Sequence, residues 1–274
     1  MRPFTYSRPG DIAELRRLLA TAGDDARLLA GGQTLIATMK QGLAAPEALI
    51  SLAGIDELTG IRVEQEALVI GAMTPHADIV RSEEVRGRIP ALTTLANEIG
   101  DPAVREKGTI GGSIANNDPA ADWPAALLGL DAVVTTDRRE WSASDFFTGM
   151  FETALAPGEV IVSVRFPVPR RGAYAKFPNP ASRYAVVGVF VAEGADGTPR
   201  VAVTGAGPVV FRWAEAEARL ADHGFRPDAL DGLSHPENGL NDDIHASAGY
   251  RAHLIGVMTR RALTRLAAAD EAAE

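Results

Sequence analysis

Residues 108–123 read GTIGGSIANNDPAADW, a stretch with three glycines, two adjacent asparagines and two aspartates. Little in it packs a large core, although 46% of the whole chain is hydrophobic. Glycines such as Gly111 and Gly112 let the backbone approach a ligand closely. Short polar side chains such as Ser113 and Asn116 form hydrogen bonds and tolerate turn conformations. The stretch predicts a polar, flexible segment that faces a ligand, and a plain turn is the alternative.

A second glycine pair lies about eighty residues earlier, in AGGQTL (residues 30–35). It follows an apolar strand, ARLLA (26–30), and precedes a helix, TLIATMK (34–40). A helix N-terminus offers free N–H groups that suit a phosphate, and Gln33 and Thr34 add side-chain donors. The pattern is neither GxGxxG nor the P-loop, so a Rossmann dinucleotide site and a P-loop are unsupported. A tight strand-to-helix turn is the alternative reading.

Three further residues can each be interpreted in two ways, as structural or as ligand-binding. Asp122 precedes a short helix, where it serves either as N-cap or as an acceptor for a sugar or ribityl hydroxyl. Lys176 and Arg183, in AKFPNPASR, are charge partners for a phosphate or solvated surface cations. None of the five histidines has metal-ligand spacing with acidic partners, so we expect them to be solvated or in the core.

Hydrophobic periodicity predicts alternating helices and strands. A first helix begins at Asp11, with Glu14 completing a capping box, and ends at Gly23. The strands at 26–30 and 48–52 flank a helix, which favours parallel pairing. The remaining elements are a hairpin over 61–72, a short helix capped by Thr74, a helix from Pro90 to Gly100, a short helix at 124–130, strands at 132–136 and 159–169, two strands of one sheet at 184–192 and 200–206, a helix at 213–224, an irregular segment at 225–245 and a long final helix.

Composition excludes several kinds of chemistry. The 274 residues carry a net charge of −9, which disfavours nucleic acid and anionic membranes, so we expect neither as a partner. There is no apolar run long enough for membrane insertion, and the first residues lack a signal-peptide core, so we expect a cytoplasmic protein. Cysteine is absent, which excludes thiolate catalysis, disulfides and iron–sulfur clusters within these residues. Redox chemistry would therefore need a bound cofactor.

The two glycine segments together resemble a known family. AGGQTLIATMK and GTIGGSIANNDPAADWPAALLGLDA are similar to the FAD-binding medium subunit of the molybdenum hydroxylases, the carbon monoxide dehydrogenase / xanthine dehydrogenase family. The likeness continues in order through EVIVSVRFPVP, KFPNPASRYAVVGVFVA, VAVTGAGPVVFRWAEAEARL and YRAHLIGVMTRRAL, and so covers essentially the whole chain.

The resemblance implies an α+β fold. It implies a two-subdomain FAD-binding domain of the vanillyl-alcohol-oxidase / cell-wall-precursor-reductase type, plus a C-terminal α+β domain with a three-stranded antiparallel sheet. The expected boundaries are residues 1–53, 54–170 and 171–274, and FAD is expected between the first two subdomains.

The resemblance also implies which residues hold FAD. One set would line the pyrophosphate: Ala30, Gly31, Gly32, Gln33, Thr34 and Leu35, with Thr109, Gly111, Gly112 and Ser113 completing it. Asn116 and Asp122 would hold ribityl or phosphate oxygens, Ile161 would pack near the isoalloxazine or adenine ring, and Lys176 would approach the flavin.

The implied function is electron transfer. A large molybdopterin-binding partner subunit would carry substrate hydroxylation, and a small partner with 2Fe-2S clusters would pass electrons to FAD in this chain and on to an external acceptor. We expect a dimer of heterotrimers, no catalytic side chain and no metal ligand in this chain. Two alternatives remain: a free-standing flavin-dependent oxidoreductase, and a partner-binding subunit without cofactor.

Overall fold

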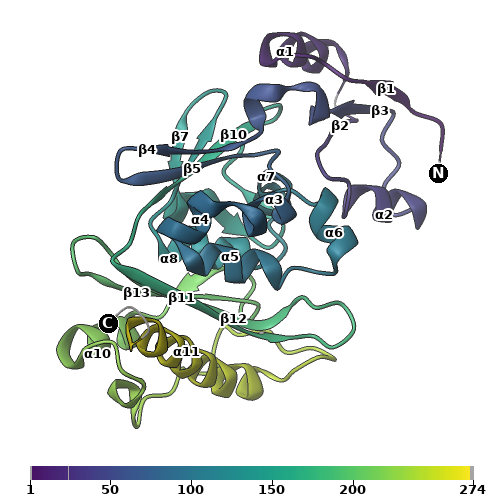
Figure 1. Ribbon diagram of the computed structural model, residues 1–274. Helices are drawn as coiled ribbons and strands as arrows, with labels where there is room; N and C mark the ends of the chain where they lie inside the picture. Colours follow the sequence, from purple (N-terminus) through teal and green to yellow (C-terminus); the bar gives the residue numbers. More distant parts are fainter. Residues whose placement is uncertain (1, 24, 272–274) are drawn as a thin grey trace.

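A computed structural model describes residues 2–23 and 25–271. Its N-terminal unit contains a three-stranded parallel sheet, in the order β1 (Thr5–Ser7), β3 (Ala48–Ser51) and β2 (Ala26–Leu29), with helices α1 (Ile12–Thr21) and α2 (Leu35–Lys40) (Figure 1). Parallel pairing of the strands either side of α2 confirms the prediction. The sequence pattern did not indicate β1, which is only three residues long.

The capping box at the start of α1 is present. Asp11 Oδ1 accepts a hydrogen bond from Glu14 N at 2.6 Å, and Glu14 Oε2 accepts one from Gly10 N at 2.8 Å. Leu15 is fully buried, in a small core with residues of β3 and of the two 3-10 turns Leu52–Gly54 and Asp56–Leu58. The cap and this buried face fix the helix against the sheet.

The middle of the chain builds a second, antiparallel sheet. Its order is β4 (Ile61–Glu64), β5 (Ala67–Gly71), β10 (Ile161–Pro167), β6 (Val133–Thr136) and β7 (Glu140–Ser142), which confirms the hairpin over 61–72. A small hairpin, β8 (Phe147–Gly149) and β9 (Glu152–Thr153), stands apart from it. The helices that accompany the sheet are α3 (His76–Arg81), α4 (Glu83–Arg88), α5 (Pro90–Asn97), α6 (Pro102–Lys107), α7 (Ile110–Asn116), α8 (Trp123–Gly129) and α9 (Ala143–Phe146).

Two helix boundaries differ from the prediction. Thr74 does not cap α3, because its hydroxyl exchanges hydrogen bonds with the backbone of Gly60 and Pro75 takes the N-cap position. The helix that begins at Pro90 ends at Asn97 rather than Gly100. The end moves because α6 begins at Pro102 with its own N-cap, Asp101, which accepts a hydrogen bond from Val104 N.

The stretch 108–123 also differs from the expected flexible segment, because half of it is helical. Helix α7 has Thr109 as N-cap, whose hydroxyl accepts a hydrogen bond from Gly112 N at 3.1 Å. Ile110 and Ile114, four residues apart, are both fully buried. Burial of this apolar pair outweighs the low helix propensity of Gly111 and Gly112.

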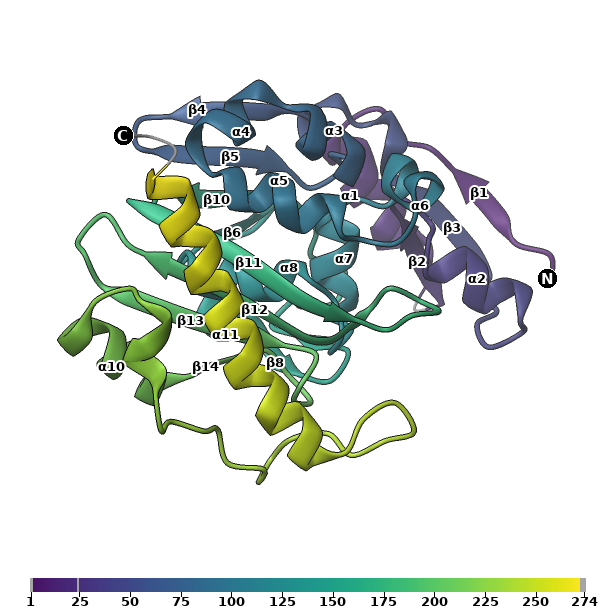
Figure 2. The same cartoon turned by 60° about the horizontal axis from the view of Figure 1, so that its bottom comes forward.

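The C-terminal part consists of a sheet with its own helices on one face. Strands β11 (Arg171–Pro178), β12 (Ala185–Glu193) and β13 (Pro199–Thr204) form the expected three-stranded antiparallel sheet, and a two-residue strand, β14 (Phe211–Arg212), adds a fourth. Helix α11 (Ala248–Glu271) crosses β11 and β12, and α10 (Ala214–His223) lies beside it (Figure 2). Residues 225–245 contain a 3-10 turn, Pro227–Leu230, and no other helix or strand among the described residues.

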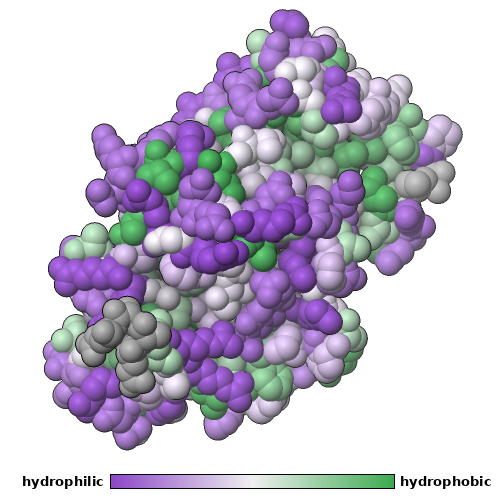
Figure 3. All heavy atoms as spheres, in the orientation of Figure 1, coloured by the Kyte–Doolittle hydropathy of each residue, from purple (hydrophilic) through white to green (hydrophobic). Residues whose placement is uncertain are grey.

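Both faces of this sheet are buried. One face packs on α8 and α5 through Tyr174, Phe190 and Ala202, and the other packs under α11 through Val187, Val189 and Val203. On the face of the molecule in Figure 3, hydrophilic residues predominate. None of the described helices is long and apolar enough to cross a membrane.

Candidate functional site

The two glycine segments border one cavity of about 650 Å³. It is lined by the turn after β2, the segment from α6 to α8, the start of β10 and the loop before β12. Of the residues expected to bind a ligand, all but Lys176 line this cavity: Ala30, Gly31, Gly32, Gln33, Thr34, Leu35, Thr109, Gly111, Gly112, Ser113, Asn116, Asp122 and Ile161. Segments about eighty residues apart in the sequence therefore meet at one site.

The turn after β2 presents unpaired backbone donors. Gly32 has a φ of +72°, which glycine adopts without strain and which reverses the chain between β2 and α2. Among the described residues, the N–H groups of four successive residues, Gly32 to Leu35, have no hydrogen-bond acceptor. The Gln33 side chain donates to Gly31 O at 3.1 Å. Four free donors at a cavity wall suit an anionic or oxygen-rich ligand.

The second glycine pair has a different role from the expected one. Gly111 N donates to Ala72 O at 2.8 Å, and Gly112 N donates to Thr109 Oγ1 at 3.1 Å, so neither amide is free for a ligand. A Cβ on Gly111 would lie 2.6 Å from Ala72 O. Gly111 thus allows α7 to pack directly on the end of β5. In this arrangement the protein itself uses the amide of Gly111 as a donor.

Gly31 makes a similar contact between the two segments. A Cβ at this position would lie 2.0 Å from Lys107 O and 2.8 Å from Gly108 Cα. The turn after β2 therefore packs on the backbone that enters α7, and no larger residue fits there. Glycines of both segments bring the walls of the cavity together.

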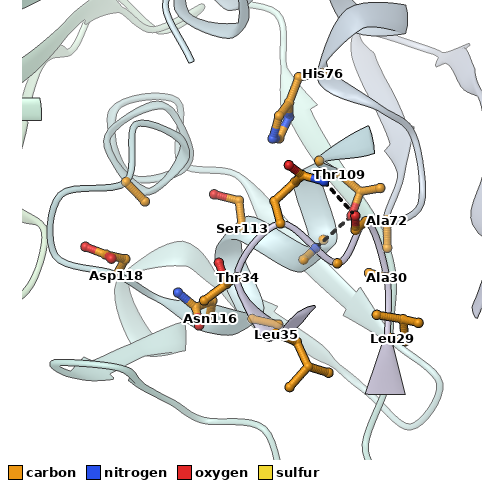
Figure 4. A pocket seen from close by; sticks show the side chains of 18 of the residues that line it. Leu29, Ala30, Thr34, Leu35, Ala72, His76, Thr109, Ser113, Asn116 and Asp118 are labelled. Carbon is orange, nitrogen blue, oxygen red and sulfur yellow. Dashed lines mark hydrogen bonds between the residues drawn. The ribbon is translucent and has the colours of Figure 1, made fainter. Parts of the chain in front are cut away.

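Helix α7 offers the cavity its side chains instead. Ser113 and Asn116 line the cavity, and among the described residues neither side chain has a hydrogen-bond partner (Figure 4). Figure 4 shows them beside Thr34, which comes from the opposite glycine segment. Hydroxyl and amide groups in this position can bind hydroxyl or phosphate oxygens.

Asp122 and Lys176 form a buried ion pair. Lys176 Nζ, on β11, lies 2.9 Å from Asp122 Oδ1 and donates to Glu98 O at 3.0 Å. Tyr174 donates its hydroxyl proton to Asp122 at 2.5 Å. Burial raises the pKa of Asp122, while Lys176 and Tyr174 oppose that rise. Asp122 occupies the N-cap position of α8, but its side chain accepts no hydrogen bond from that helix.

The same contacts correct the reading of Lys176. It is neither a solvated cation nor a residue of the cavity wall, because 1% of its side chain is exposed and Asp122 stands between it and the cavity. Lys176 contacts one lining residue, Asp122, directly, and also donates to Glu98 O beside the lining residue Ile99. Arg183, the other cation of that stretch, does line the cavity.

An apolar wall completes the site. Ile161, the first residue of β10, lies with Val160, Leu155, Leu29 and Met73 along the cavity. Such a surface can pack against a flat ring of a ligand, and the free amides and hydroxyls can form hydrogen bonds with its polar groups. Both kinds of lining occur in one cavity.

Tyr184 and His76 are among the residues of the site that sequence reasoning did not assign to it. Tyr184, in the loop before β12, lines the cavity together with Thr34 of the turn after β2. Burial raises the pKa of its phenol. His76 lines the cavity from the start of α3. Neither residue lies in a motif, and only the tertiary contacts place them at the cavity.

Comparison with known proteins agrees with the geometry. Residues 2–169 match the family model described as "FAD binding domain in molybdopterin dehydrogenase". The chain is 35% identical over 274 residues to the carbon monoxide dehydrogenase medium chain of Hydrogenophaga pseudoflava, covering 95% of this chain and 96% of that one. It is 33% identical over 282 residues to the 6-hydroxypseudooxynicotine dehydrogenase complex subunit alpha of Paenarthrobacter nicotinovorans, covering 97% and 95%.

Solved structures show the same likeness. The Cu,Mo-CO dehydrogenase contains a chain with a TM-score of 0.89 and 35% identity, covering 98% of this chain and 99% of that one. Quinoline 2-oxidoreductase from Pseudomonas putida 86 contains one with a TM-score of 0.87 and 27% identity, covering 98% of each. With the cavity described above, these comparisons show that the chain is a member of the molybdenum hydroxylase family of oxidoreductases, as its FAD-binding medium subunit.

Proposed function

We propose that this chain is the electron-transfer subunit of a molybdenum hydroxylase complex. Through bound FAD it would take electrons from the 2Fe-2S clusters of a small partner subunit and pass them to an external acceptor. A large molybdopterin-binding partner would carry substrate hydroxylation, with the whole arranged as a dimer of heterotrimers. The names of relatives, a "medium chain" and a "medium subunit", support an assembly of several subunits.

The single observation that carries the proposal is the row of free donors from Gly32 to Leu35 beside an apolar wall. Backbone amides suit a pyrophosphate, and a flat ring suits the apolar wall, so the residues present fit FAD. When bound, FAD supplies both hydride and one-electron chemistry. Because the 274 residues contain no cysteine, they offer no thiolate ligands for an iron–sulfur cluster, which supports clusters held by a partner subunit.

We propose that FAD is bound by the residues that the sequence indicated, although some of them have other roles than expected. Ala30 to Leu35 would line the pyrophosphate, and Thr109, Gly111 and Gly112 would shape the wall opposite. Ser113, Asn116 and Asp122 would bond ribityl or phosphate oxygens, and Ile161 would pack on a ring. Lys176 would act by fixing Asp122.

Purification from the native organism tests this function. A tagged chain is expected to co-purify in equal amounts with one molybdopterin-containing and one iron–sulfur subunit, and to carry one FAD. The chain alone, loaded with FAD, is expected not to oxidise aldehydes, purines or N-heterocycles. Turnover of such substrates by the chain alone would support a free-standing oxidoreductase, and a folded chain that takes up no FAD would support a subunit without cofactor.

A further inference from the structure

His76 is a buried histidine at the wall of the cavity. It opens helix α3, 4% of it is exposed, and its backbone N donates to Gly108 O at 2.9 Å. Its imidazole points toward Thr109, at the entry to α7 (Figure 4). Burial, with a smaller contribution from the positive charge of Arg105, lowers the pKa of His76 to about 4. The ring is therefore neutral near neutral pH.

Trp123 fixes which ring nitrogen carries the proton. The indole Nε1 of Trp123 lies 3.1 Å from His76 Nδ1. An indole N–H only donates, so Nδ1 must be the acceptor, and a neutral imidazole then has its proton on Nε2. Trp123 is fully buried at the start of α8 and also packs on Phe166, so it cannot turn away easily.

The Nε2–H group that results is a donor without a partner. No acceptor for it exists among residues 2–23 and 25–271. A Cβ on Gly108 would lie 3.0 Å from Nε2, so Gly108 packs closely beside this edge of the ring and a larger residue there would press on it. Nε2 is not one of the fully buried side-chain atoms that lack a partner, so it is accessible from the cavity that His76 lines. A ligand in the cavity can therefore supply the acceptor.

We infer that His76 binds FAD by donating its Nε2–H to an acceptor atom of the cofactor, and that Trp123 is the positioning residue that holds the required tautomer. The inference rests on the proposed binding of FAD in this cavity. FAD would then be bound by a neutral side-chain donor on α3 as well as by the backbone donors of the turn after β2. These two sets of donors lie on different elements.

Two substitutions of His76 separate its two nitrogens. In His76→Asn the carboxamide ends near the position of Nδ1, so it can accept from Trp123 but offers nothing at Nε2. In His76→Gln the carboxamide reaches the position of Nε2 and can donate there. Losing one neutral hydrogen bond is expected to weaken FAD binding by about 3- to 10-fold in His76→Asn, and His76→Gln is expected to recover part of that loss.

The test is equilibrium titration of the flavin-free full chain with FAD, for wild type and both variants, after circular dichroism has confirmed that each is folded. Nitrogen-15 NMR of the wild type reads the tautomer directly: Nε2 is expected to be protonated, and its resonance to shift when FAD is added. Equal FAD affinity of His76→Asn and wild type, or a proton on Nδ1, would overturn the inference while leaving FAD binding intact. Failure of the wild-type chain to bind FAD would overturn the proposed function instead.

Discussion

Lys176 Nζ lies 2.9 Å from Asp122 Oδ1, in a buried pair that ties the C-terminal sheet to the start of helix α8. Because Asp122 also faces the cavity, this contact couples the C-terminal sheet to the site, in addition to the lining residues Arg183 and Tyr184. The contact has consequences for stability that can be measured.

Replacing Lys176 by Met is expected to destabilise the chain by about 3–5 kcal/mol, because it leaves a buried carboxylate without its counter-charge. The measurement is the free energy of unfolding in urea. Adding Asp122→Asn to this variant is expected to recover part of the loss, since the buried charge is then removed. Lys40→Met, at an exposed position, is the control, with an expected change within about 0.5 kcal/mol. A Lys176→Met chain as stable as the control would contradict the coupling.

The second prediction concerns Gly31. An added Cβ would lie 2.0 Å from Lys107 O, so Gly31→Ala must separate the turn after β2 from the segment entering α7. We expect a loss of about 1–3 kcal/mol in unfolding free energy, and weaker FAD binding in the same variant. Gly87→Ala, in helix α4, is the matched control, because a Cβ there meets no atom within 4 Å. The control is expected to be unchanged or more stable by up to about 1 kcal/mol. Equal behaviour of the two variants would show that the close approach has no role.

The third prediction is a pH dependence caused by His76. Its pKa in the folded chain, about 4, lies below the ordinary histidine value of 6.5. Between these values the unfolded chain binds more protons, so stability is lost as pH falls from about 6.5 to about 4. The full effect is about 3 kcal/mol. Unfolding free energies of wild type and His76→Gln, measured across that range, are expected to fall more steeply for wild type. Parallel curves would contradict the burial of a neutral imidazole.

Much of the fold could be predicted from the sequence because its signals are local. The capping box at Asp11 and Glu14, and the strand–turn–helix around Gly32, each occupy a few neighbouring residues. Helix α7 was missed because glycines and asparagines have low helix propensity. A threonine cap followed by Ile110 and Ile114 was the signal that could have revealed it.

The roles within the site were less predictable, because they depend on distant partners. Lys176 is buried only because β11 packs under α5 and α8, and one lysine in a sequence gives no sign of that. The tautomer of His76 depends on Trp123, 47 residues later. Gly111 lies at the site as expected, yet its amide is used by Ala72, a contact that only the tertiary structure creates.

The most direct test of the central claim is titration of the flavin-free full chain with FAD, followed by flavin fluorescence. If the donors of Gly32 to Leu35 and the facing apolar wall form a dinucleotide site, binding saturates at one FAD per chain and Gly31→Ala weakens it. A folded chain that shows no saturable FAD binding would contradict the account.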